Sequence, residues 1–368
     1  MTTERIETVI IGAGQAGLAT AYHLQRRGRP CLVLDGNARV GDGWRRQWDS
    51  LRLYSPARFN GLPGMRFPAP SWSFPGKDDM ADFVEAYAEK FSLPVRLGTR
   101  VHRVEARDGG YTVTAGAHCI EADNVVVATG TFGRTPHVPE FADQLDPEIV
   151  QLHSSEYRRL SQLRDGPVLV VGASHSGCDI AFEAAVSHRT VLCGRDPGQV
   201  PGRLDSPLFK IVYPGVVFVF SHVLTRRTPM GRHAMEEFRL HGGPMLRVKR
   251  QDLLDRGVER VAARVVGVRA GHPVLDDGRE VKVSNVVWCT GFRQAFDWVH
   301  LPVFDTHGWP EEERGVVDKA PGLFFCGLGF QYAASSMLVR GVGRDACYVA
   351  ARIEHRVRSH QRAVVPTG

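Results

Sequence analysis

The stretch Val9–Gly17, which reads VIIGAGQAG, decides the fold of this chain, and Val168–Gly177, which reads VLVVGASHSG, repeats its pattern. In each copy a short apolar run, typical of a buried parallel strand, leads into a glycine turn that opens a helical segment. The start of such a helix presents free N–H groups and a positive dipole end to the phosphates of a dinucleotide. The sequence therefore predicts two dinucleotide-binding units on one chain.

Each position of the two turns has its own task. Gly12 and Gly172 allow the tight turn after the strand, and Gly14 lets the backbone approach a pyrophosphate. Gly17 and Gly177 let the helix pack closely on the strand. The predicted cofactor contacts in these turns are Gly12, Gly14, Gln15, Ala16, Gly17, Gly172, Ser174, His175, Ser176 and Gly177.

Opposite charges stand at the same position of the two copies. Asp35 follows Gly12 by 23 residues, and Arg195 follows Gly172 by 23 residues. An acidic residue there accepts hydrogen bonds from a ribose 2′-hydroxyl, whereas an arginine accommodates a 2′-phosphate. We expect the first unit to bind FAD or NAD and the second to bind NADP. Simpler interpretations stay open: Asp35 caps a turn, Arg195 is a surface cation, and His175 faces solvent.

The two copies also end alike. Asn124–Gly130 (NVVVATG) and Asn285–Gly291 (NVVWCTG) are each an apolar strand that closes on a Thr-Gly turn. The repeat therefore extends over a domain-sized unit. Further predicted cofactor contacts are Ala128, Thr129, Gly130, Thr290 and Gly291.

The order of elements predicts a discontinuous first domain. A strand at Leu323–Cys326, a glycine turn and a final helix at Val342–Arg356 follow the second copy, and such a unit usually returns to the first nucleotide domain. Alternating strands and helices favour an α/β fold with parallel sheets. We predict two Rossmann-like domains: an FAD domain of residues 1–150 and 290–368, and an inserted NADPH domain of residues 151–289.

The chain resembles the class B flavin-containing monooxygenases, above all their short bacterial members and the plant YUCCA-type enzymes. The resemblance spans essentially the whole chain. The run Trp48–Pro56, which reads WDSLRLYSP, is far more specific than either glycine motif. The other matching segments are Gly12–Gly17, Gly41–Arg45, Pro63–Gly64, Thr129–Gly130, His153–Arg158, the second glycine turn and Thr290–Phe292.

The resemblance implies a monooxygenase that uses FAD and NADPH. In this family NADPH passes a hydride to flavin N5, and reduced flavin takes up O2 as a C4a-(hydro)peroxide that oxygenates a small organic substrate. Trp44 and Arg45 are expected to contact FAD, although a loop anchor and a solvated charge are the simpler interpretations. The family pattern adds Gly43, Trp48, Val101, Gly327 and Gln331 as cofactor contacts.

Two departures from the family pattern bear on the reaction. Tyr157 stands where Baeyer–Villiger members typically carry Trp, which disfavours ketone insertion. Tyr54 and Ser55 stand where many N-oxidising members place Asn and Gly beside the flavin. The catalytic side chains are therefore unassigned, and Tyr54 and Ser55 are the candidates near the flavin.

Cysteine usage and charge exclude several other functions. None of the seven cysteines forms a Cys-x-x-Cys pair, which counts against a disulfide reductase and indicates reduced thiols in a cytoplasmic protein. No cluster with metal-ligand spacing is present in the sequence, so no metal is expected. The net charge of +6 is spread along the chain without an aromatic-interleaved basic stripe, so we expect no nucleic-acid partner.

The longest apolar stretch, residues 208–224, falls short of a membrane span because it contains Lys210, Pro214 and His222. Three interpretations remain: a buried or interface helix, a wall of the substrate channel, or a contact with the membrane surface. Oligomeric state is open.

The function predicted from the sequence is FAD- and NADPH-dependent oxygenation of a small organic molecule by O2. The acceptor is a soft heteroatom or a 2-oxo acid undergoing oxidative decarboxylation, as the YUCCA resemblance suggests. The alternatives are an NADPH-dependent flavin reductase or electron-transfer protein, an NADPH oxidase, and a non-enzymatic redox sensor.

Overall fold

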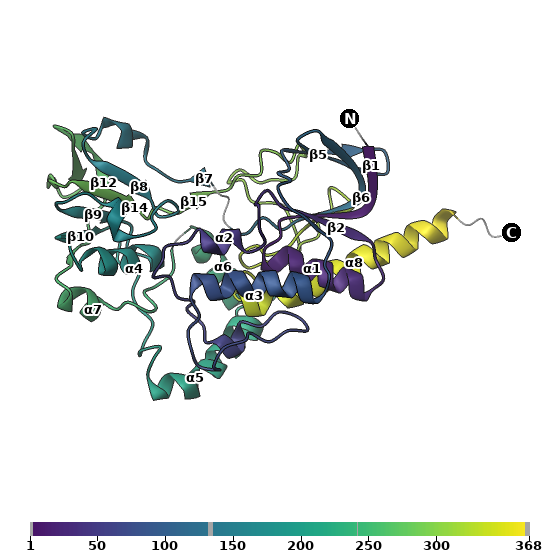
Figure 1. Cartoon of the computed structure of the whole chain (residues 1–368), viewed down its shortest axis with the longest axis horizontal. Helices are drawn as coiled ribbons and strands as arrows, with labels where there is room; N and C mark the ends of the chain where they lie inside the picture. The colour runs from purple at the N-terminus through teal and green to yellow at the C-terminus, as the bar shows by residue number, and fades with distance from the viewer. Residues whose placement is uncertain (1–2, 132–134, 241, 365–368) are drawn as a thin grey trace.

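Two β-sheets, each centred on the strand of one glycine turn, form the two lobes of the molecule (Figure 1). The structure is a computed structural model that describes residues 3–131, 135–240 and 242–364. The α/β class with parallel sheets, predicted from the sequence, is confirmed.

The first sheet has the order β3-β2-β1-β6-β5-β4, and β16 adds to the free side of β6. Strand β1 pairs in parallel with β2 and β6, so Ile11 lies between Leu34 and Val127. The carboxyl ends of these strands therefore meet at one edge of the sheet. The strands are β1 (Thr3–Ile11), β2 (Cys31–Leu34), β3 (Val95–Arg96), β4 (Arg103–Arg107), β5 (Gly110–Ala115), β6 (His118–Val127) and β16 (Leu323–Phe325).

The second sheet repeats this arrangement with the order β11-β10-β9-β14-β8, all parallel. Val171 at the end of β9 lies between Cys193 of β10 and Trp288 of β14. The two predicted copies are therefore equivalent in space as well as in sequence. The strands are β8 (Val150–His153), β9 (Val168–Val171), β10 (Thr190–Cys193), β11 (Glu259–Val261) and β14 (Asn285–Trp288), beside the separate hairpin of β12 (Val265–Arg269) and β13 (His272–Leu275).

A short antiparallel ribbon of β7 (Thr135–Pro136) and β15 (Phe292–Arg293) joins the lobes (Figure 1). The first sheet takes strands from both ends of the chain, and the whole second sheet lies between them in sequence. The insertion of one nucleotide unit into the other is thereby confirmed. The individual domain boundaries, 1–150, 151–289 and 290–368, remain our proposal.

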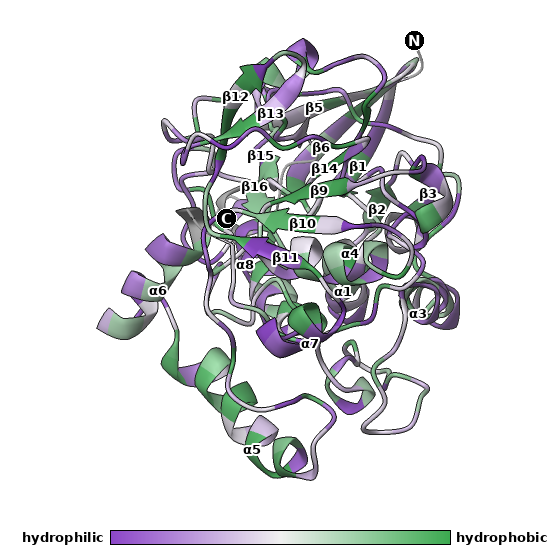
Figure 2. Cartoon of the chain, turned by 90° about the vertical axis from the view of Figure 1, so that its left-hand side faces the viewer, coloured by the Kyte–Doolittle hydropathy of each residue, from purple (hydrophilic) through white to green (hydrophobic). Residues whose placement is uncertain are grey.

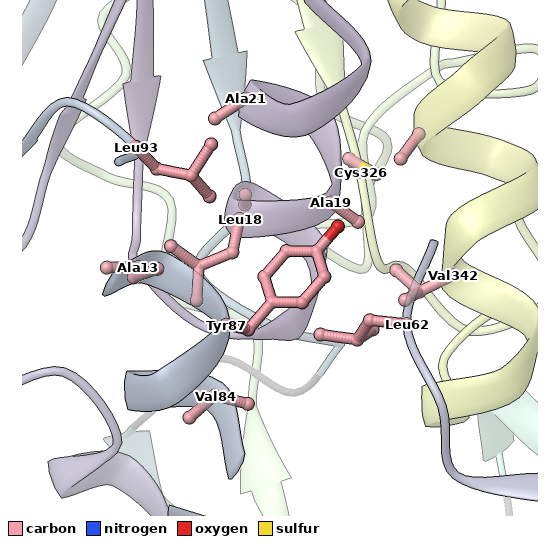
Figure 3. Close-up of a cluster of buried hydrophobic side chains, with 14 of the residues drawn as sticks. Ala13, Leu18, Ala19, Ala21, Leu62, Val84, Tyr87, Leu93, Cys326 and Val342 are labelled. Atoms are coloured by element: carbon pink, nitrogen blue, oxygen red, sulfur yellow. The ribbon is translucent and has the colours of Figure 1, made fainter. Parts of the chain in front are cut away.

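The helices α1 (Gln15–Arg26), α3 (Lys77–Lys90) and α8 (Val339–Val364) cover one face of the first sheet. Figure 3 shows Leu18, Tyr87 and Val342 meeting between them, all fully buried. Each such side chain contributes roughly 1.5–3 kcal/mol by leaving water. The Tyr87 hydroxyl donates to the carbonyl of Pro63 at 2.8 Å, which fastens the following loop to this core.

The apolar stretch at residues 208–224 forms α5 (Pro207–Phe218) and one π-helical turn, η4 (Val219–Val223). Tyr213 is the buried residue of α5, whereas Leu208, Ile211 and Phe218 are 65%, 77% and 59% exposed. Figures 1 and 2 show α5 projecting away from both sheets. The interpretation of α5 as a helix buried within the chain is therefore wrong, because none of the described residues packs over its outer face.

No helix in the described ranges combines the length and apolarity that a bilayer crossing requires. The remaining helices and turns are α2 (Asp42–Arg45), η1 (Ala57–Phe59), η2 (Glu140–Gln144), η3 (Leu160–Gln162), α4 (His175–Ala184), α6 (Pro229–Leu240) and α7 (Arg250–Asp255).

The glycine turns pack backbone against backbone. Gly12 has φ +110°, and a Cβ there would lie 2.6 Å from the carbonyl oxygen of Ala128. A Cβ on Gly17 would overlap the carbonyl of Gly12, which has no room to move. A Cβ on Gly14, in contrast, would point into open space. Gly12 and Gly17 thus serve the packing, and Gly14 leaves room for a ligand.

We expect Gly17→Ala to lower the free energy of unfolding by about 2 kcal/mol or more, because the added methyl overpacks a backbone contact. Gly14→Ala is the matched control for packing, because its φ of −82° suits alanine. It should leave unfolding unchanged and weaken flavin nucleotide binding about tenfold, which corresponds to about 1.4 kcal/mol. Denaturant titration and flavin titration of the apoprotein measure the two effects. Equal unfolding losses in both variants would contradict this assignment.

Candidate functional site

The first glycine turn forms an open cradle at the carboxyl edge of the first sheet. Helix α1 begins after Gly14 with no side chain capping its N–H groups and no acidic residue in its first turn. The cradle therefore suits a phosphate group by both its hydrogen-bond donors and its dipole. Across the cradle, a Cβ on Gly327 would lie 2.7 Å from the Cβ of Ala16. The predicted residues Gly12–Gly17 and Gly327 thus lie together.

Asp35 lies beside this cradle and stabilises it by hydrogen bonds. One carboxylate oxygen accepts a hydrogen bond from the N–H of Ala13 at 2.6 Å, and the other accepts from the N–H of Asn37 at 2.8 Å. The turn-capping role left open by the sequence is therefore present. Carboxylate oxygens accept more than one hydrogen bond, so the ribose role is compatible with it and stays a prediction. Val101 is half-buried and packs against the core of the first sheet.

Helix α2 sets Trp44 next to the cradle and turns Arg45 away from it. The indole N–H of Trp44 donates to Gln15 Oε1 at 3.4 Å, on the first residue of α1. The guanidinium of Arg45 donates to Asp82 and Glu85 of α3, each at 2.9 Å. The interpretation of Arg45 as a solvated charge is therefore wrong, because carboxylates of α3 hold its guanidinium. Its cofactor role, like that of Gly43, stays a prediction.

The side chain of Trp48 lies in the core of the second lobe rather than in the first. It is 4% exposed and packs with Tyr157 and Val170. Its indole Nε1 is buried without a hydrogen-bond partner. Such a donor is costly to leave unsatisfied, so it marks a position where a bound group would be stabilised.

The turn after β16 is organised by Gln331, which is fully buried. Its Oε1 accepts from the N–H groups of Gly327 and Leu328, at 3.0 and 3.3 Å, and its Nε2 donates to the carbonyl of Phe325 at 3.0 Å. The amide therefore shapes this turn. A contact of Gln331 with the flavin edge stays a prediction.

The closing turns are fixed by the connector between the lobes. The Thr290 hydroxyl donates to the carbonyl of His137, and the N–H of His137 donates to the carbonyl of Gly291 at 2.9 Å. In the first lobe Gly130 has φ +102°, and the next residue, Thr131, donates to the carbonyl of Gly327 at 2.7 Å. Ala128 and Thr129 precede this turn at the edge that carries the cradle.

The second glycine turn opens α4 in the same way. A Cβ on Gly177 would overlap the carbonyl of Gly172, as in the first copy. Ser174 precedes the helix and donates to the carbonyl of Gly243 at 2.8 Å, so its hydroxyl does not cap α4. No acidic residue occupies the first turn, where Ser176 lies. This turn also fits a phosphate.

His175 does not simply face solvent. Its ring lies 5.1 Å from the ring of Tyr54, and its Nε2 is buried without a hydrogen-bond partner. Burial lowers the pKa of His175, which keeps the imidazole neutral near pH 7. A neutral ring can donate one hydrogen bond to a bound ligand.

Arg195 is exposed two residues after β10, one position further along than Asp35 after β2, because the register places Cys193 where Leu34 lies and Gly194 where Asp35 lies. No carboxylate in the described part of the chain pairs with it. A cation in this place remains available to a 2′-phosphate.

A hydrogen-bonded network joins the lobes between the two turns. The Tyr54 hydroxyl donates to Asp179 of α4 at 3.0 Å, and Arg247 pairs with the same carboxylate at 3.1 Å. The Asp179 side chain is 2% exposed. Burial and the neighbouring carboxylate raise the pKa of Tyr54 well above its usual value, so the phenol stays protonated. Ser55 instead donates to the amide oxygen of Asn60 at 2.5 Å.

Sequence reasoning missed Asp179 and Arg247. The one available signal was an acidic residue four positions after His175, on a helix whose other inward positions are apolar. Tyr54 is thereby a positioning donor, and catalytic roles for Tyr54 and Ser55 stay predictions.

The same interface brings together the two segments that carry the family resemblance. Ser50 and Tyr157 both donate to Glu183 of α4, the latter at 3.0 Å. The N–H of Asp49 donates to the carbonyl of Arg158 at 2.8 Å. Residues 48–56 and 153–158 are thus neighbours, which explains why both are distinctive.

Burial makes most of the cysteines poor nucleophiles in this fold. All seven are free thiols, and burial raises the pKa of Cys31, Cys178, Cys193 and Cys326 to about 12. A dithiol redox centre requires a thiolate at neutral pH. Within the described ranges, no three His, Cys, Asp or Glu side chains are placed to share a metal ion.

Comparison with known proteins agrees with this architecture. The family described as pyridine nucleotide-disulphide oxidoreductase matches residues 9–199. A CzcO-like uncharacterized oxidoreductase of Geobacillus kaustophilus is 33% identical and covers 94% of this chain and 97% of its own length. The indole-3-pyruvate monooxygenase YUCCA1 of Oryza sativa subsp. japonica is 36% identical over 49% of this chain and 46% of its own.

Two solved structures share the fold. The flavin-containing monooxygenase from Stenotrophomonas maltophilia has a TM-score of 0.76 at 24% identity, over 96% of this chain and 99% of its own. The OTEMO complex with FAD and NADP has a TM-score of 0.67 at 17% identity, over 98% and 87% of the two chains.

We expect Asp179→Ala to destabilise the protein by about 3 kcal/mol, because it leaves Arg247 and the Tyr54 hydroxyl without their buried partner. Tyr54→Phe removes one hydrogen bond and should cost about 1 kcal/mol. The exposed Asp277→Ala is the control and should change nothing measurable. Denaturant unfolding measures all three, and similar losses for Asp179→Ala and Asp277→Ala would contradict a network that holds the lobes together.

Proposed function

Because the chain belongs to the pyridine nucleotide-disulphide oxidoreductase family and is similar to flavin monooxygenases, we propose that it oxygenates a small organic substrate with O2, using FAD and NADPH. The observation that carries this proposal is the pair of equivalent phosphate cradles with opposite charges at equivalent strand ends. Asp35 stands in one and Arg195 in the other. Two different dinucleotides bound side by side are what hydride transfer requires.

The contents of the first cradle support FAD as its ligand. The uncapped start of α1 and the open space beside Gly14 accept the pyrophosphate, and Asp35 offers its carboxylate to the adenosine ribose. A bound flavin would supply two-electron redox chemistry and, with O2, oxygen transfer to the substrate.

The second lobe supports NADPH rather than NADH. Arg195 is exposed and free of carboxylate partners within the described residues, so a 2′-phosphate would form a charge-assisted contact there. The start of α4 accepts the pyrophosphate. His175 and Tyr54 lie between the two cradles, and their neutral rings exclude water from the place where the two redox rings would meet.

The acceptor is a soft heteroatom or a 2-oxo acid. The partial likeness to an indole-3-pyruvate monooxygenase supports the second class. A thiol-disulfide reaction finds no support, because no two cysteines form a Cys-x-x-Cys pair and burial raises the pKa of Cys178 and Cys326 to about 12.

We expect NADPH to reduce the flavin about tenfold faster than NADH at equal subsaturating concentration, since a charge-assisted contact contributes about 1.5–3 kcal/mol. Arg195→Ala should remove most of this preference. Arg189→Ala is the matched control, because Arg189 is an exposed arginine at the opposite end of the same strand and pairs with Glu259. Anaerobic stopped-flow reduction measures the rates. Equal rates for both coenzymes in the parent protein would remove the basis for the Arg195 assignment.

Oxygenation itself is tested by mixing NADPH-reduced holoenzyme with O2 in a stopped-flow spectrophotometer. We expect a flavin–oxygen adduct that persists for seconds and decays faster when a substrate is added. Direct return to oxidised flavin, with one hydrogen peroxide formed for each NADPH, would favour the oxidase or reductase alternative. Coupling of NADPH use to oxygenated product, across amines, thioethers and 2-oxo acids, then ranks the substrate classes.

A further inference from the structure

A cavity of about 580 Å³ opens between the loop of residues 58–66, the α5–η4 segment and the first turn of α8. None of the predicted cofactor contacts lines it. Three arginines do, Arg58, Arg66 and Arg340, and none of the described residues around it is acidic. A cavity lined by three cations and no carboxylate has a strong preference for an anion.

Arg340 is the central cation of this cavity. Its Nη1 donates to the Tyr213 hydroxyl at 3.4 Å, and its guanidinium lies 5.8 Å from the Tyr213 ring centroid. Its Nε is buried without a hydrogen-bond partner, and no carboxylate among the described residues pairs with it. Burial also lowers the pKa of Arg340. A desolvated guanidinium without a counter-ion is costly, and an anionic ligand would offset that cost.

Two other arginines, Arg226 and Arg344, have structural roles because each is held by a partner from another segment. Arg226 pairs with the buried carboxylate of Glu312 at 2.7 Å. Arg344, one turn after Arg340 on α8, donates to the carbonyl of Ser221 at 2.8 Å and so fastens η4 to the helix. Arg340, one turn before Arg344, has only a phenol as its partner among the described residues.

Two further features add positive potential. Arg58 lies over the rings of Phe59 and Trp72, at 5.3 and 5.1 Å, and Arg66 is exposed at the rim. Helix α8 is 26 residues long and begins at Val339 with no acidic residue in its first turn, so the positive end of its dipole faces the cavity beside Arg340.

The rest of the wall is apolar. Phe59, Leu62 and Met65 line one side and Val217 the other. Leu62 belongs to the core of the first lobe, and the Phe59 ring packs edge-on against Tyr213 at 5.1 Å, so this surface is firmly held. A ligand that matches both the cationic and the apolar parts of the cavity has a carboxylate and an apolar body.

The cavity also connects with the region between the two cradles. Tyr213, the partner of Arg340, lies beside Ser55. Ser55 follows Tyr54, whose ring packs on His175 of the second glycine turn. The path from Arg340 to the predicted redox centre is therefore a short chain of direct contacts.

We propose that this cavity binds an organic carboxylate, with Arg340 pairing to the carboxylate and the apolar body of the ligand lying on Phe59, Leu62 and Met65. The assignment of this cavity as the substrate site rests on the proposed monooxygenase function. Its assignment as an anion-binding site does not depend on that function.

The test uses two inert ligands of the same shape, 3-phenylpropanoate and 3-phenylpropan-1-ol, which lack a soft heteroatom and a 2-oxo group. Isothermal titration of the oxidised holoenzyme measures binding without turnover. We expect the acid to bind at least about tenfold more tightly than the alcohol, which corresponds to about 1.4 kcal/mol. In Arg340→Gln this ratio should fall close to one.

The control Arg269→Gln removes an exposed charge on β12 and should keep the ratio. Should Arg340→Gln fail to fold, the double variant Arg58→Gln/Arg66→Gln, at exposed positions, should lower the ratio about threefold or more. Equal binding of acid and alcohol by the parent protein, or an unchanged ratio in these variants, would overturn the proposal. Displacement of the acid by inorganic phosphate at the same concentration would overturn the claim that the apolar wall contributes to binding.

This experiment is independent of the oxygenation test. A holoenzyme that forms the flavin–oxygen adduct but does not distinguish the acid from the alcohol contradicts only the cavity assignment. A holoenzyme that distinguishes them but returns directly to oxidised flavin contradicts only the proposed function.

Discussion

The whole architecture depends on backbone packed against backbone at two glycine turns. In each lobe the start of a helix rests on the end of a strand so closely that a single methyl group at Gly17 or Gly177 would overlap a carbonyl oxygen. This contact fixes the direction of the helix and leaves its first N–H groups uncapped. Unsatisfied donors at a helix start are stabilised by an anion. The packing constraint and the binding capacity are therefore the same feature of the chain.

The second requirement is that the two cradles keep a defined position relative to each other. A buried carboxylate, Asp179, receives a hydrogen bond from Tyr54 of the first lobe and an ion pair from Arg247 of its own lobe. A buried charge is stabilising only while all its partners stay in place, so the network favours one arrangement of the lobes over others. Glu183, one turn further along α4, likewise accepts hydrogen bonds from Ser50 and Tyr157.

Sequence reasoning could predict what depends on local pattern. Strand ends and glycine turns follow from spacing alone, and the register of the sheets agrees with them, although it places Arg195 one residue beyond the position of Asp35. It could not predict what packs against a given side chain. Arg45 turns to carboxylates of α3 that lie about 40 positions later, and α5 is apolar without being buried. Both outcomes depend on tertiary neighbours, which periodicity does not encode.

The distribution of arginine partners separates structural cations from cations available to ligands. Arg45, Arg226 and Arg247 each have a carboxylate within 3.1 Å, and each holds two segments of the chain together. Arg195 and Arg340 have none in the described ranges, although one stands at a strand end and the other at a helix start beside a cavity. An arginine left without a counter-ion contributes little to folding and, when desolvated, opposes it. An anionic ligand would supply the missing counter-ion at both positions.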